Sequence, residues 1–259
     1  MLNIFQALFL GVIQGITEWL PVSSSGHLAV VQHYIGLDVP IAFDVLLHVA
    51  TLLVILVAFR GDIKSVIVAA VRRDFKSPEG RLFLMVIIGC VPTALIGFSL
   101  QAFFESMFNN MALVGGALIF TGVILVASRN GSGERRIGKG SALLVGIAQG
   151  FAVAPGISRS GSTIGAALFT GIERRQAISF SFLLAIPAII GAMAFKFDEL
   201  VVAGIGVDAM ITGFIASLVV GYVSLKLLIR TIMNKKFSWF AVYCFVLGFV
   251  LVLSSLVFV

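Results

Sequence analysis

The fold of this chain is decided by two related stretches, ALFLGVIQGITEWLPVSSSG at residues 7–26 and ALLVGIAQGFAVAPGISRSG at residues 142–161. Aligned at a constant offset of 135 residues, they are identical at eight of 20 positions. In each, a Ser- and Gly-rich turn interrupts an apolar run, and each half-run of about 12–18 residues is shorter than the ~20 residues that span a bilayer. Non-helical backbone at membrane depth must be enclosed by protein. Both stretches are therefore predicted to be re-entrant helical hairpins with the polar turn at mid-depth.

The composition is that of a membrane protein. The chain has 259 residues, of which 59% are hydrophobic and 12% charged, and its mean hydropathy is +1.12. A soluble domain carries about 25% charged residues, so a soluble fold is not expected. Six further apolar runs each have close to the ~20 residues needed to cross the hydrocarbon core, at residues 41–59, 82–104, 111–128, 177–195, 209–229 and 239–259. The sequence predicts an all-α polytopic membrane protein.

The order of hairpins and spans predicts two repeats of opposite topology within a single membrane domain, residues 1–259. Repeat 1 covers about residues 1–128 and repeat 2 about residues 141–259. Each consists of one re-entrant hairpin followed by three transmembrane helices. Because three is an odd number, the second copy enters the membrane from the opposite side. This is the inverted-repeat arrangement, in which broken helices meet near the midplane.

The basic residues orient this arrangement. Fifteen of the 18 lie in four segments, residues 60–81, 129–140, 173–176 and 230–238. The predicted topology places all four on one side, which the positive-inside rule assigns to the cytoplasm. A multi-pass protein of the plasma membrane is expected, with both termini and the opening of the site on the outer side. These loops account for the net charge of +6, so nucleic acid is not expected as a partner.

The second hairpin turn carries a cation, Arg159, at membrane depth. Such a residue costs about 2.5–3.5 kcal/mol even on lenient scales and marks a functional site by default. A helix that begins near Ser160 adds the positive end of its dipole, and an arginine fork matches phosphate. The neighbouring side chains and glycines favour an oxyanion ligand; they are Ser158, Ser160, Ser162, Thr163, Gly156 and Gly161.

The first hairpin carries acid–base groups. Gln14 and Glu18 share one helix face at i, i+4 spacing. A buried carboxylate needs a partner or a task, and Glu18 can serve as a general base, a metal ligand or an ion-pair partner of Arg159. His27 follows Ser24 by three residues, which supplies the set needed for proton transfer at neutral pH.

Two more polar residues, Asp44 and His48, lie one turn apart near the outer start of a predicted span. They can line the same cavity, but capping and packing explain them about as well. His33 has no distinguishing context and is assigned to the surface or the membrane interface.

The two repeats differ where the chemistry is expected. At the offset of 135, Glu18 matches Val153, Ser24 matches Arg159 and His27 matches Ser162. One copy holds the acid–base groups and the other holds the cation. A purely structural duplication gives no reason for this division, whereas an active site at the pseudo-two-fold axis does.

Two motifs carry a resemblance to a known family. QGITEWLPVSSSGH at residues 14–27 resembles the first signature of the undecaprenyl-diphosphate phosphatases, the bacitracin-resistance membrane phosphatases, and PGISRSGST at residues 155–163 resembles the second. The resemblance covers essentially the whole chain. It implies hydrolysis of a polyprenyl diphosphate to the monophosphate carrier of cell-envelope glycan assembly and inorganic phosphate. Where members of the family can carry a second carboxylate, this chain has Gln14, which leaves Glu18 as the single candidate metal ligand of this motif.

The predicted site has two groups of residues. Those expected to be catalytic are Glu18, Ser24, His27 and Arg159, and those expected to bind substrate are Gln14, Ser23, Ser25, Ser158, Ser160 and Thr163. Either Ser24 attacks phosphorus with His27 as base, or His27 activates a water. Glu18 positions or deprotonates His27, or it holds a divalent cation, Mg²⁺ or Ca²⁺; no organic cofactor is expected.

Other functions and assemblies stay open at this stage. A lipid transporter or flippase shares the inverted repeat without hydrolytic chemistry, and a binding-only membrane subunit shows no turnover. The expected partners are the lipid diphosphate and the surrounding membrane lipids. The sequence leaves open whether the protein forms a homodimer.

Overall fold

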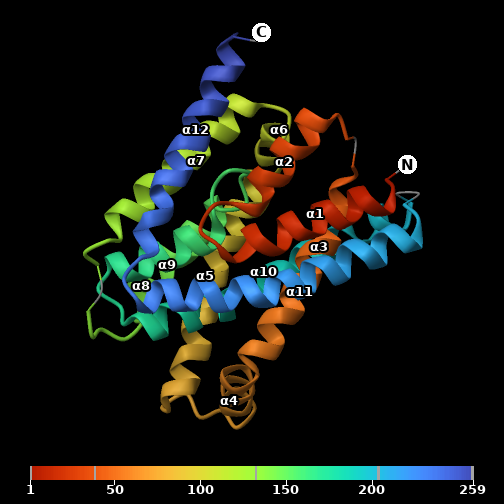
Figure 1. The fold of residues 1–259 in the computed structure, drawn as a ribbon. Coiled ribbons are helices and arrows are strands. Elements are labelled where there is room, and N and C mark those ends of the chain that lie inside the picture. Colours follow the sequence, from red (N-terminus) through yellow and green to blue (C-terminus); the bar gives the residue numbers. More distant parts are fainter. Residues whose placement is uncertain (1, 38, 132, 203–204, 258–259) are drawn as a thin grey trace.

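The computed structural model describes residues 2–37, 39–131, 133–202 and 205–257, and these residues form helices and connecting turns without a β-strand (Figure 1). The helices, in chain order, are α1 (Ile4–Trp19), α2 (Ser24–Ile35), α3 (Ile41–Ala58), α4 (Arg60–Val71), α5 (Pro78–Ser99), α6 (Gln101–Met107), α7 (Met111–Ala127), α8 (Lys139–Phe151), α9 (Arg159–Phe169), α10 (Arg174–Val202), α11 (Val207–Met233), the 3₁₀ turn η1 (Phe237–Trp239) and α12 (Phe240–Val257). The predicted all-α class is confirmed.

Several helices have the dimensions of membrane spans. Four in the described ranges are long and apolar enough to cross a bilayer, namely Pro78–Ser99, Arg174–Ala194, Val207–Met233 and Phe237–Val257. Two bent pairs bring the number to six if each pair is one span: α3 with α4, bent by 79°, and α6 with α7, bent by 105°. The chain is therefore a polytopic membrane protein, as predicted.

Two boundaries differ from the prediction. The segment 60–81, expected to be a loop, contains α4, and the span expected at 82–104 ends at Ser99 before the separate helix α6. α4 exposes the charged residues Arg60, Asp62 and Lys64 in its first half and buries Val66 and Ala69. Its charges interrupt the apolar run, so average hydropathy does not reveal it.

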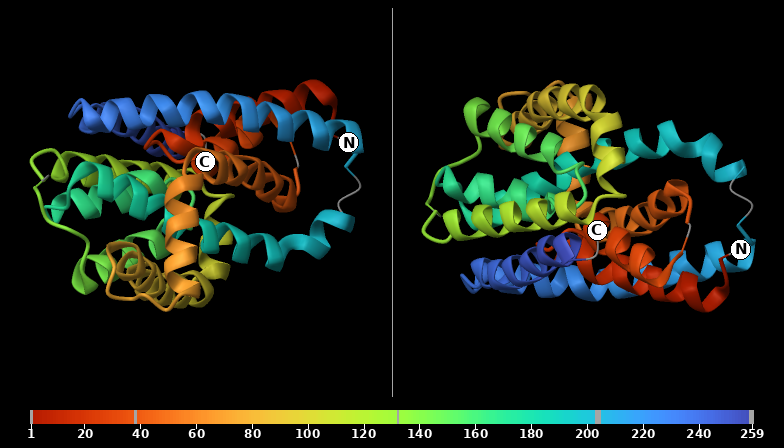
Figure 2. Two further views of the ribbon diagram at one scale, coloured as in Figure 1. Left: turned by 90° about the horizontal axis from the view of Figure 1, so that it is seen from below. Right: turned by 90° about the horizontal axis from the view of Figure 1, so that it is seen from above.

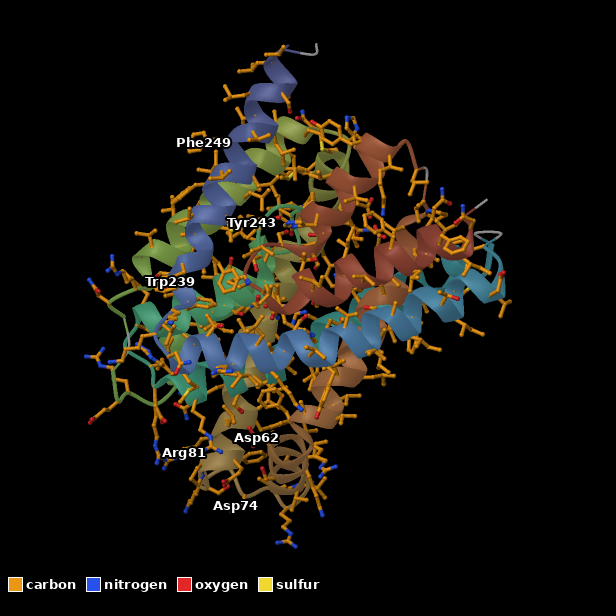
Figure 3. The ribbon with its side chains drawn as sticks, viewed as in Figure 1. Asp62, Asp74, Arg81, Trp239, Tyr243 and Phe249 are labelled. Carbon is orange, nitrogen blue, oxygen red and sulfur yellow. The ribbon has the colours of Figure 1, made fainter. Side chains whose placement is uncertain are left out.

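Helix α4 is tied to the rest of the protein at its first turn. The Ser179 hydroxyl on α10 donates a hydrogen bond of 2.6 Å to the Asp62 carboxylate on α4. Figure 3 shows Asp62, together with Asp74 and Arg81, at the end of the molecule that α4 forms. Tyr243 lies on α12, well away from α4, in the same view.

The two broken stretches form hairpins whose long arms pack against distant helices. α1 runs along α11, α8 runs along α5, and α7 runs along α12 (Figures 1 and 2). The first two contacts depend on glycine. A Cβ atom at Gly11 would collide with the carbonyl oxygen of Gly213, and one at Gly146 would collide with that of Gly89. Gly11 and Gly146 occupy identical positions of the two aligned stretches, so the same residue type makes the same kind of contact in both.

The end of α1 is anchored in the main apolar core. Trp19 is fully buried and packs edge-on against Phe182 of α10, with ring centroids 5.4 Å apart. A buried aromatic side chain contributes strongly to packing, so this contact fixes the last turn of α1. The residue before it, Glu18, is held in place as a consequence.

Candidate active site

The first hairpin turn is built around Ser23. This residue caps α2: its hydroxyl accepts a hydrogen bond of 3.2 Å from the Gly26 N–H. Its φ of +68° lies in the left-handed region, which is uncommon for a residue other than glycine and tends to occur at functional sites. This turn presents Ser24 as the first residue of α2.

The second hairpin turn repeats this cap. The Ser158 hydroxyl accepts a hydrogen bond of 3.1 Å from the Gly161 N–H at the start of α9. Thr121 of α7 supports the turn, since its hydroxyl donates to the Gly156 carbonyl at 2.9 Å and accepts from the Ser158 N–H at 3.0 Å. Arg159 is therefore the first residue of α9, in the position that Ser24 has in α2.

The tips of the two hairpins touch. The Gly156 N–H donates a hydrogen bond of 3.0 Å to the Ser23 hydroxyl, and the Ser160 hydroxyl donates one of 2.9 Å to the Trp19 carbonyl. A Cβ atom at Gly26 would lie only 2.9 Å from the Gly156 nitrogen, so this approach requires glycine. The two turns, 133 residues apart in sequence, thus form one site.

Glu18 is the centre of the polar network. Its Oε2 accepts hydrogen bonds from the Ser24 hydroxyl at 2.5 Å and from Gln14 Nε2 at 3.0 Å. His48 Nε2 lies 3.3 Å from the same oxygen. Its Oε1 pairs with Arg159 Nη2. The Glu18 side chain is only 4% exposed, so its charge is stabilised by these partners rather than by water.

The guanidinium group of Arg159 has one paired and one unpaired terminal nitrogen among the described residues. Nη2 pairs with Glu18, whereas Nη1 is buried and has no hydrogen-bond partner within the described parts of the chain. The side chain is 15% exposed, and its Cζ lies 5.8 Å from the centre of the Trp19 ring. One face of the fork is therefore held by protein, and the other remains free to bind an anion.

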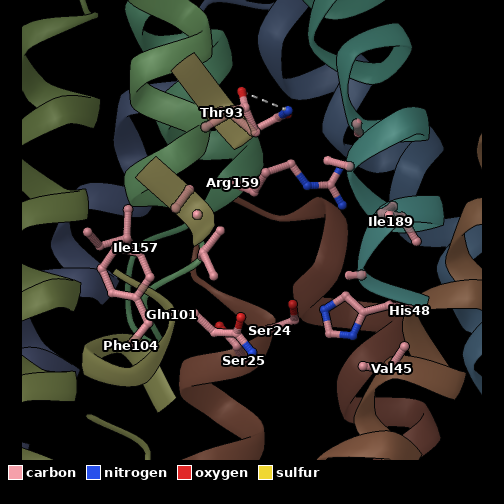
Figure 4. Close-up of a pocket in the computed structure, with 18 of the residues that line it drawn as sticks. Ser24, Ser25, Val45, His48, Thr93, Gln101, Phe104, Ile157, Arg159 and Ile189 are labelled. Carbon is pink, nitrogen blue, oxygen red and sulfur yellow. Dashed lines mark hydrogen bonds between the residues drawn. The ribbon is translucent and has the colours of Figure 1, made fainter. Parts of the chain in front are cut away.

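A cavity of about 430 Å³ contains this network. Glu18, Ser24 and Arg159 line one part of it together with Asp44 and His48. Other parts of the wall are apolar and come mainly from α5, α6 and α10: Phe98, Phe104, Phe108, Ala188 and Ile189. Figure 4 shows Arg159 above Ser24 and His48, with Phe104 and Ile157 to one side. A cavity of this composition suits an amphiphile with an anionic head.

The structure does not bring His27 into the network. Its Nδ1 donates to the Ser23 carbonyl at 2.8 Å, and its Nε2 accepts from the Tyr243 hydroxyl at 2.6 Å. The ring also stacks on Tyr243, with centroids 5.6 Å apart. Both ring nitrogens are occupied on the side of α2 that faces α12, and His27 does not line the cavity. The expected contact of His27 with Glu18 is therefore corrected: the imidazole beside Glu18 belongs to His48.

His48 reaches Glu18 from α3. Its Nδ1 donates to the Asp44 carbonyl at 2.7 Å, which turns Nε2 toward Glu18. The Asp44 carboxylate also lines the cavity and accepts from Gln32 Nε2 at 3.0 and 3.2 Å. The sequence left these two residues open between packing and the cavity, and the structure places both at the cavity.

The remaining predicted residues fall into two sets. Ser23, Ser25 and Ser158 line the cavity. Gln14 and Ser160 lie behind it, where they hold Glu18 and the Trp19 carbonyl. Thr163 is also outside the lining: its hydroxyl donates to the Arg159 carbonyl at 2.7 Å and accepts from Ser181 at 2.5 Å. Thr163 is therefore placed to support the first turn of α9 rather than to contact a ligand.

Two lining residues, Thr93 and Gln149, were not singled out from the sequence as site residues. Thr93 on α5 donates to the Gly146 carbonyl at 2.9 Å, and Gln149 on α8 is buried beside it. A signal for Gln149 was available, because it is identical to Gln14 at the offset of 135. Thr93 has no such signal.

The donor set does not fit a resident divalent cation. Both oxygens of Glu18 are engaged by Arg159, Ser24, Gln14 and His48. No group of three or more His, Cys, Asp or Glu residues arranged to hold a metal ion occurs among the described residues. Mg²⁺ and Ca²⁺ prefer several oxygen ligands in a defined geometry, and Glu18 is already committed to its protein partners.

The fold and the site define a class: a polytopic helical membrane protein in which two hairpin tips enclose a serine, a carboxylate and an arginine within an amphipathic cavity. Residues 7–250 match the family described as "Bacitracin resistance protein BacA". The chain therefore belongs to the BacA family.

Curated relatives agree with this assignment over nearly their whole length. A protein of Carboxydothermus hydrogenoformans named undecaprenyl-diphosphatase is 44% identical over 257 residues, which is 95% of each chain. One of the same name from Desulfosudis oleivorans is 44% identical over 261 residues, covering 94% of this chain and 95% of the relative. Another, from Methanosphaera stadtmanae, is 38% identical and covers 99% of this chain and 100% of the relative.

Proposed function

We propose that this protein is an integral membrane phosphatase that hydrolyses undecaprenyl diphosphate, or a closely similar polyprenyl diphosphate, to the monophosphate and inorganic phosphate. This reaction returns the lipid carrier to cell-envelope glycan synthesis. The observation that carries the proposal is the Ser24 hydroxyl, 2.5 Å from a buried carboxylate that also pairs with Arg159. Family membership and the name of the relatives, undecaprenyl-diphosphatase, supply the substrate class.

The first step is attack by Ser24 on the terminal phosphorus. Its Oγ forms a bond to phosphorus, the bond from phosphorus to the bridging oxygen breaks, and the polyprenyl monophosphate leaves. Glu18 accepts the hydroxyl proton, since its Oε2 already accepts the Ser24 hydrogen bond. Glu18 therefore has the role of base for Ser24 that the sequence predicted for His27.

Arg159 stabilises the transferring phosphoryl group. Its free Nη1 binds a phosphoryl oxygen while Nη2 stays paired with Glu18. Such a preorganised donor in a site with little water favours the transition state. The Ser25 and Ser158 side chains that line the cavity add hydroxyl donors.

His48 and Gln14 keep Glu18 in its reactive orientation. Both approach Oε2, His48 from α3 and Gln14 from the preceding turn of α1. Contacts of this kind from residues behind a reacting group fix the direction of that group. Any Mg²⁺ or Ca²⁺ that takes part would reach the site on the diphosphate of the substrate, which is a common mode of Mg²⁺ binding.

The inverted repeat is part of the proposal. Exchange of the two halves maps the contact of α1 with α11 onto that of α8 with α5, and it maps the contact between α7 and α12 onto itself. The caps at Ser23 and Ser158 correspond in the same way. These equivalences support two repeats related by a pseudo-two-fold axis through the hairpin tips.

The orientation is also proposed. The basic segments 60–81, 129–140, 173–176 and 230–238 face the cytoplasm. The cavity, with Asp44, Gln101 and Phe108 in its lining, then opens toward the outer side, where both termini lie. The polyprenyl tail extends from the apolar part of the cavity into the bilayer.

Phosphate release by purified protein tests the function. Wild type in detergent or in lipid nanodiscs is expected to release phosphate from undecaprenyl diphosphate, and Ser24→Ala and Glu18→Gln are expected to release little. A transporter without hydrolytic chemistry would move the lipid diphosphate across a bilayer and release none. Absence of phosphate release from well-folded wild type would overturn the proposal.

A further inference from the structure

Gln149 lines the catalytic cavity and carries a buried acceptor that has no partner among the residues that the structure describes. Its side chain lines the cavity and is 3% exposed. Nε2 donates to the Leu184 carbonyl at 3.1 Å, and a carbonyl can only accept, so the direction of the amide is determined. Oε1 then has no hydrogen-bond partner within the part of the chain that the structure describes. A buried acceptor without a partner is costly. Gln14 Oε1 also lacks a partner in the described ranges, but only Gln149 of the two lines the cavity, where a bound donor can reach it.

The position of Gln149 relative to Ser24 suits an in-line reaction. Gln149 Nε2 lies 3.5 Å from the Thr93 hydroxyl. Figure 4 shows Thr93 on one side of the Arg159 guanidinium group, and Ser24 with His48 on the other. Gln149, which lies beside Thr93, therefore lines the same cavity as Ser24 but from the Thr93 side of the guanidinium group. In phosphoryl transfer the attacking and leaving oxygens lie roughly in line through phosphorus.

We propose that Gln149 positions the water that hydrolyses the phosphoseryl enzyme, an inference that rests on the proposed covalent route through Ser24. The polyprenyl monophosphate leaves from the side opposite Ser24, and water then takes its place with one hydrogen bonded to Gln149 Oε1. An amide side chain orients the attacking water in GTP hydrolases in the same manner. The free acceptor is suited to water and unsuited to a phosphate oxygen, which carries no proton to donate.

The second half-reaction balances with the groups present. The water oxygen forms a bond to phosphorus while the bond from phosphorus to Ser24 Oγ breaks. Glu18, protonated in the first step, returns its proton to Oγ. The attacking water passes one proton to a phosphoryl oxygen, and dihydrogen phosphate leaves. Gln149 accepts a hydrogen bond throughout and exchanges no proton.

The repeat supplies a matched control. Gln14 is identical to Gln149 at the offset of 135, but its Nε2 donates to Glu18, which acts in the first step. The same substitution at the two glutamines is therefore expected to slow different half-reactions. Methionine suits both positions, because it is of similar length and has no amide group.

The experiment compares Gln149→Met with Gln14→Met, using substrate labelled in its terminal phosphate, rapid quench and steady-state kinetics. For Gln149→Met we expect kcat to fall about 10- to 100-fold, the loss typical of a misplaced reactant, while kcat/KM stays within about twofold. Labelled enzyme accumulates, and polyprenyl monophosphate appears in a burst. For Gln14→Met we expect kcat/KM to fall without accumulation of labelled enzyme, because the first step is affected.

Each outcome decides a different question. If wild type is labelled on Ser24 but Gln149→Met has an unchanged kcat, the role of Gln149 is overturned and the proposed function still stands. A fall of kcat/KM in Gln149→Met without labelled enzyme would overturn it as well. Turnover by Ser24→Ala, with no labelled enzyme in any variant, would overturn the covalent route itself. Gln149→Asn, which withdraws the amide by one carbon, gives the same comparison if the methionine variant does not fold.

Discussion

Replacement of Arg159 by lysine tests how the site uses its single buried cation. Arg159 has two tasks at once: Nη2 pairs with Glu18, and Nη1 is free for a phosphoryl oxygen. Lysine keeps the charge, but its compact ammonium group lacks the planar fork that serves both. If the ammonium stays with Glu18, the phosphoryl group loses one transition-state donor. Removal of such a donor costs about 2.7–4 kcal/mol, so kcat/KM is expected to fall about 100- to 1,000-fold.

The alanine variant separates catalysis from folding. Arg159→Ala leaves Glu18 without its cationic partner in a buried position, and breaking a buried ion pair destabilises a protein by about 3–5 kcal/mol. We therefore expect Arg159→Ala to lower the unfolding temperature measurably and Arg159→Lys to lower it less. The unfolding temperature of each variant is measured in detergent and compared with its rate of phosphate release. A variant that is inactive but keeps the unfolding temperature of wild type has lost catalysis and not its fold.

A second arginine in the same repeat serves as a matched control for Arg159. Arg175, at the start of α10, is exposed and does not line the cavity. Arg175→Lys is expected to keep the activity and stability of wild type. Hydrolysis of the lipid diphosphate by folded Arg159→Lys within about threefold of wild type would show that a single ammonium group suffices for both tasks, and would refute the need for the fork.

The other expectations concern the nucleophile, the two histidines and the orientation. If Ser24 attacks, Ser24→Ala abolishes both turnover and labelled phosphoenzyme in a rapid-quench assay; robust turnover without phosphoenzyme would instead favour attack by water. His48→Leu is expected to lower kcat/KM about 10-fold, the loss expected when a residue that orients a reacting group is removed, whereas His48→Gln, which keeps a donor near the carboxylate, retains more activity. His27→Ala is expected to lower activity by loosening the capping turn while leaving the shape of the pH–rate profile unchanged, and a lost limb of that profile would restore His27 as a proton carrier. Single cysteines at Asp208 and Lys236, in a background without native cysteines, are expected to react with an impermeant maleimide from outside intact cells only at Asp208, and the reverse labelling would contradict the orientation.

The sequence predicts the helices well because membrane spans follow from length and hydropathy. The spans expected at 41–59 and 111–128 correspond to α3, Ile41–Ala58, and α7, Met111–Ala127. Internal similarity identifies both hairpins. Helix α4 was not predicted, because its charged residues interrupt the apolar run and it is held by tertiary contacts such as that of Asp62 with Ser179. Hydropathy averaged over a window does not report such contacts.

The composition of the site was harder to predict from local spacing. Ser24 and His27 are three residues apart on a helix and would ordinarily share a face. In α2 the His27 ring instead reaches back to the Ser23 carbonyl and packs on Tyr243 of α12, a contact between distant parts of the chain. The imidazole beside Glu18 comes from another helix, 30 positions further along the chain, and no local pattern distinguishes it from a packing residue.

The two halves explain why some repeat positions are identical and others are not. Gly11 and Gly146 make the same close approach to a neighbouring glycine, and Ser23 and Ser158 form the same cap, so the same residue is required in both copies. The next position along the chain differs and holds Ser24 in one copy and Arg159 in the other. Phosphoryl transfer needs a nucleophile on one side of phosphorus and a cation beside it, and two arginines facing each other would repel. Ser24 and Arg159 occupy the same position of the two repeats. The proposed two-fold axis therefore brings the nucleophile from one repeat and the cation from the other into a single cavity.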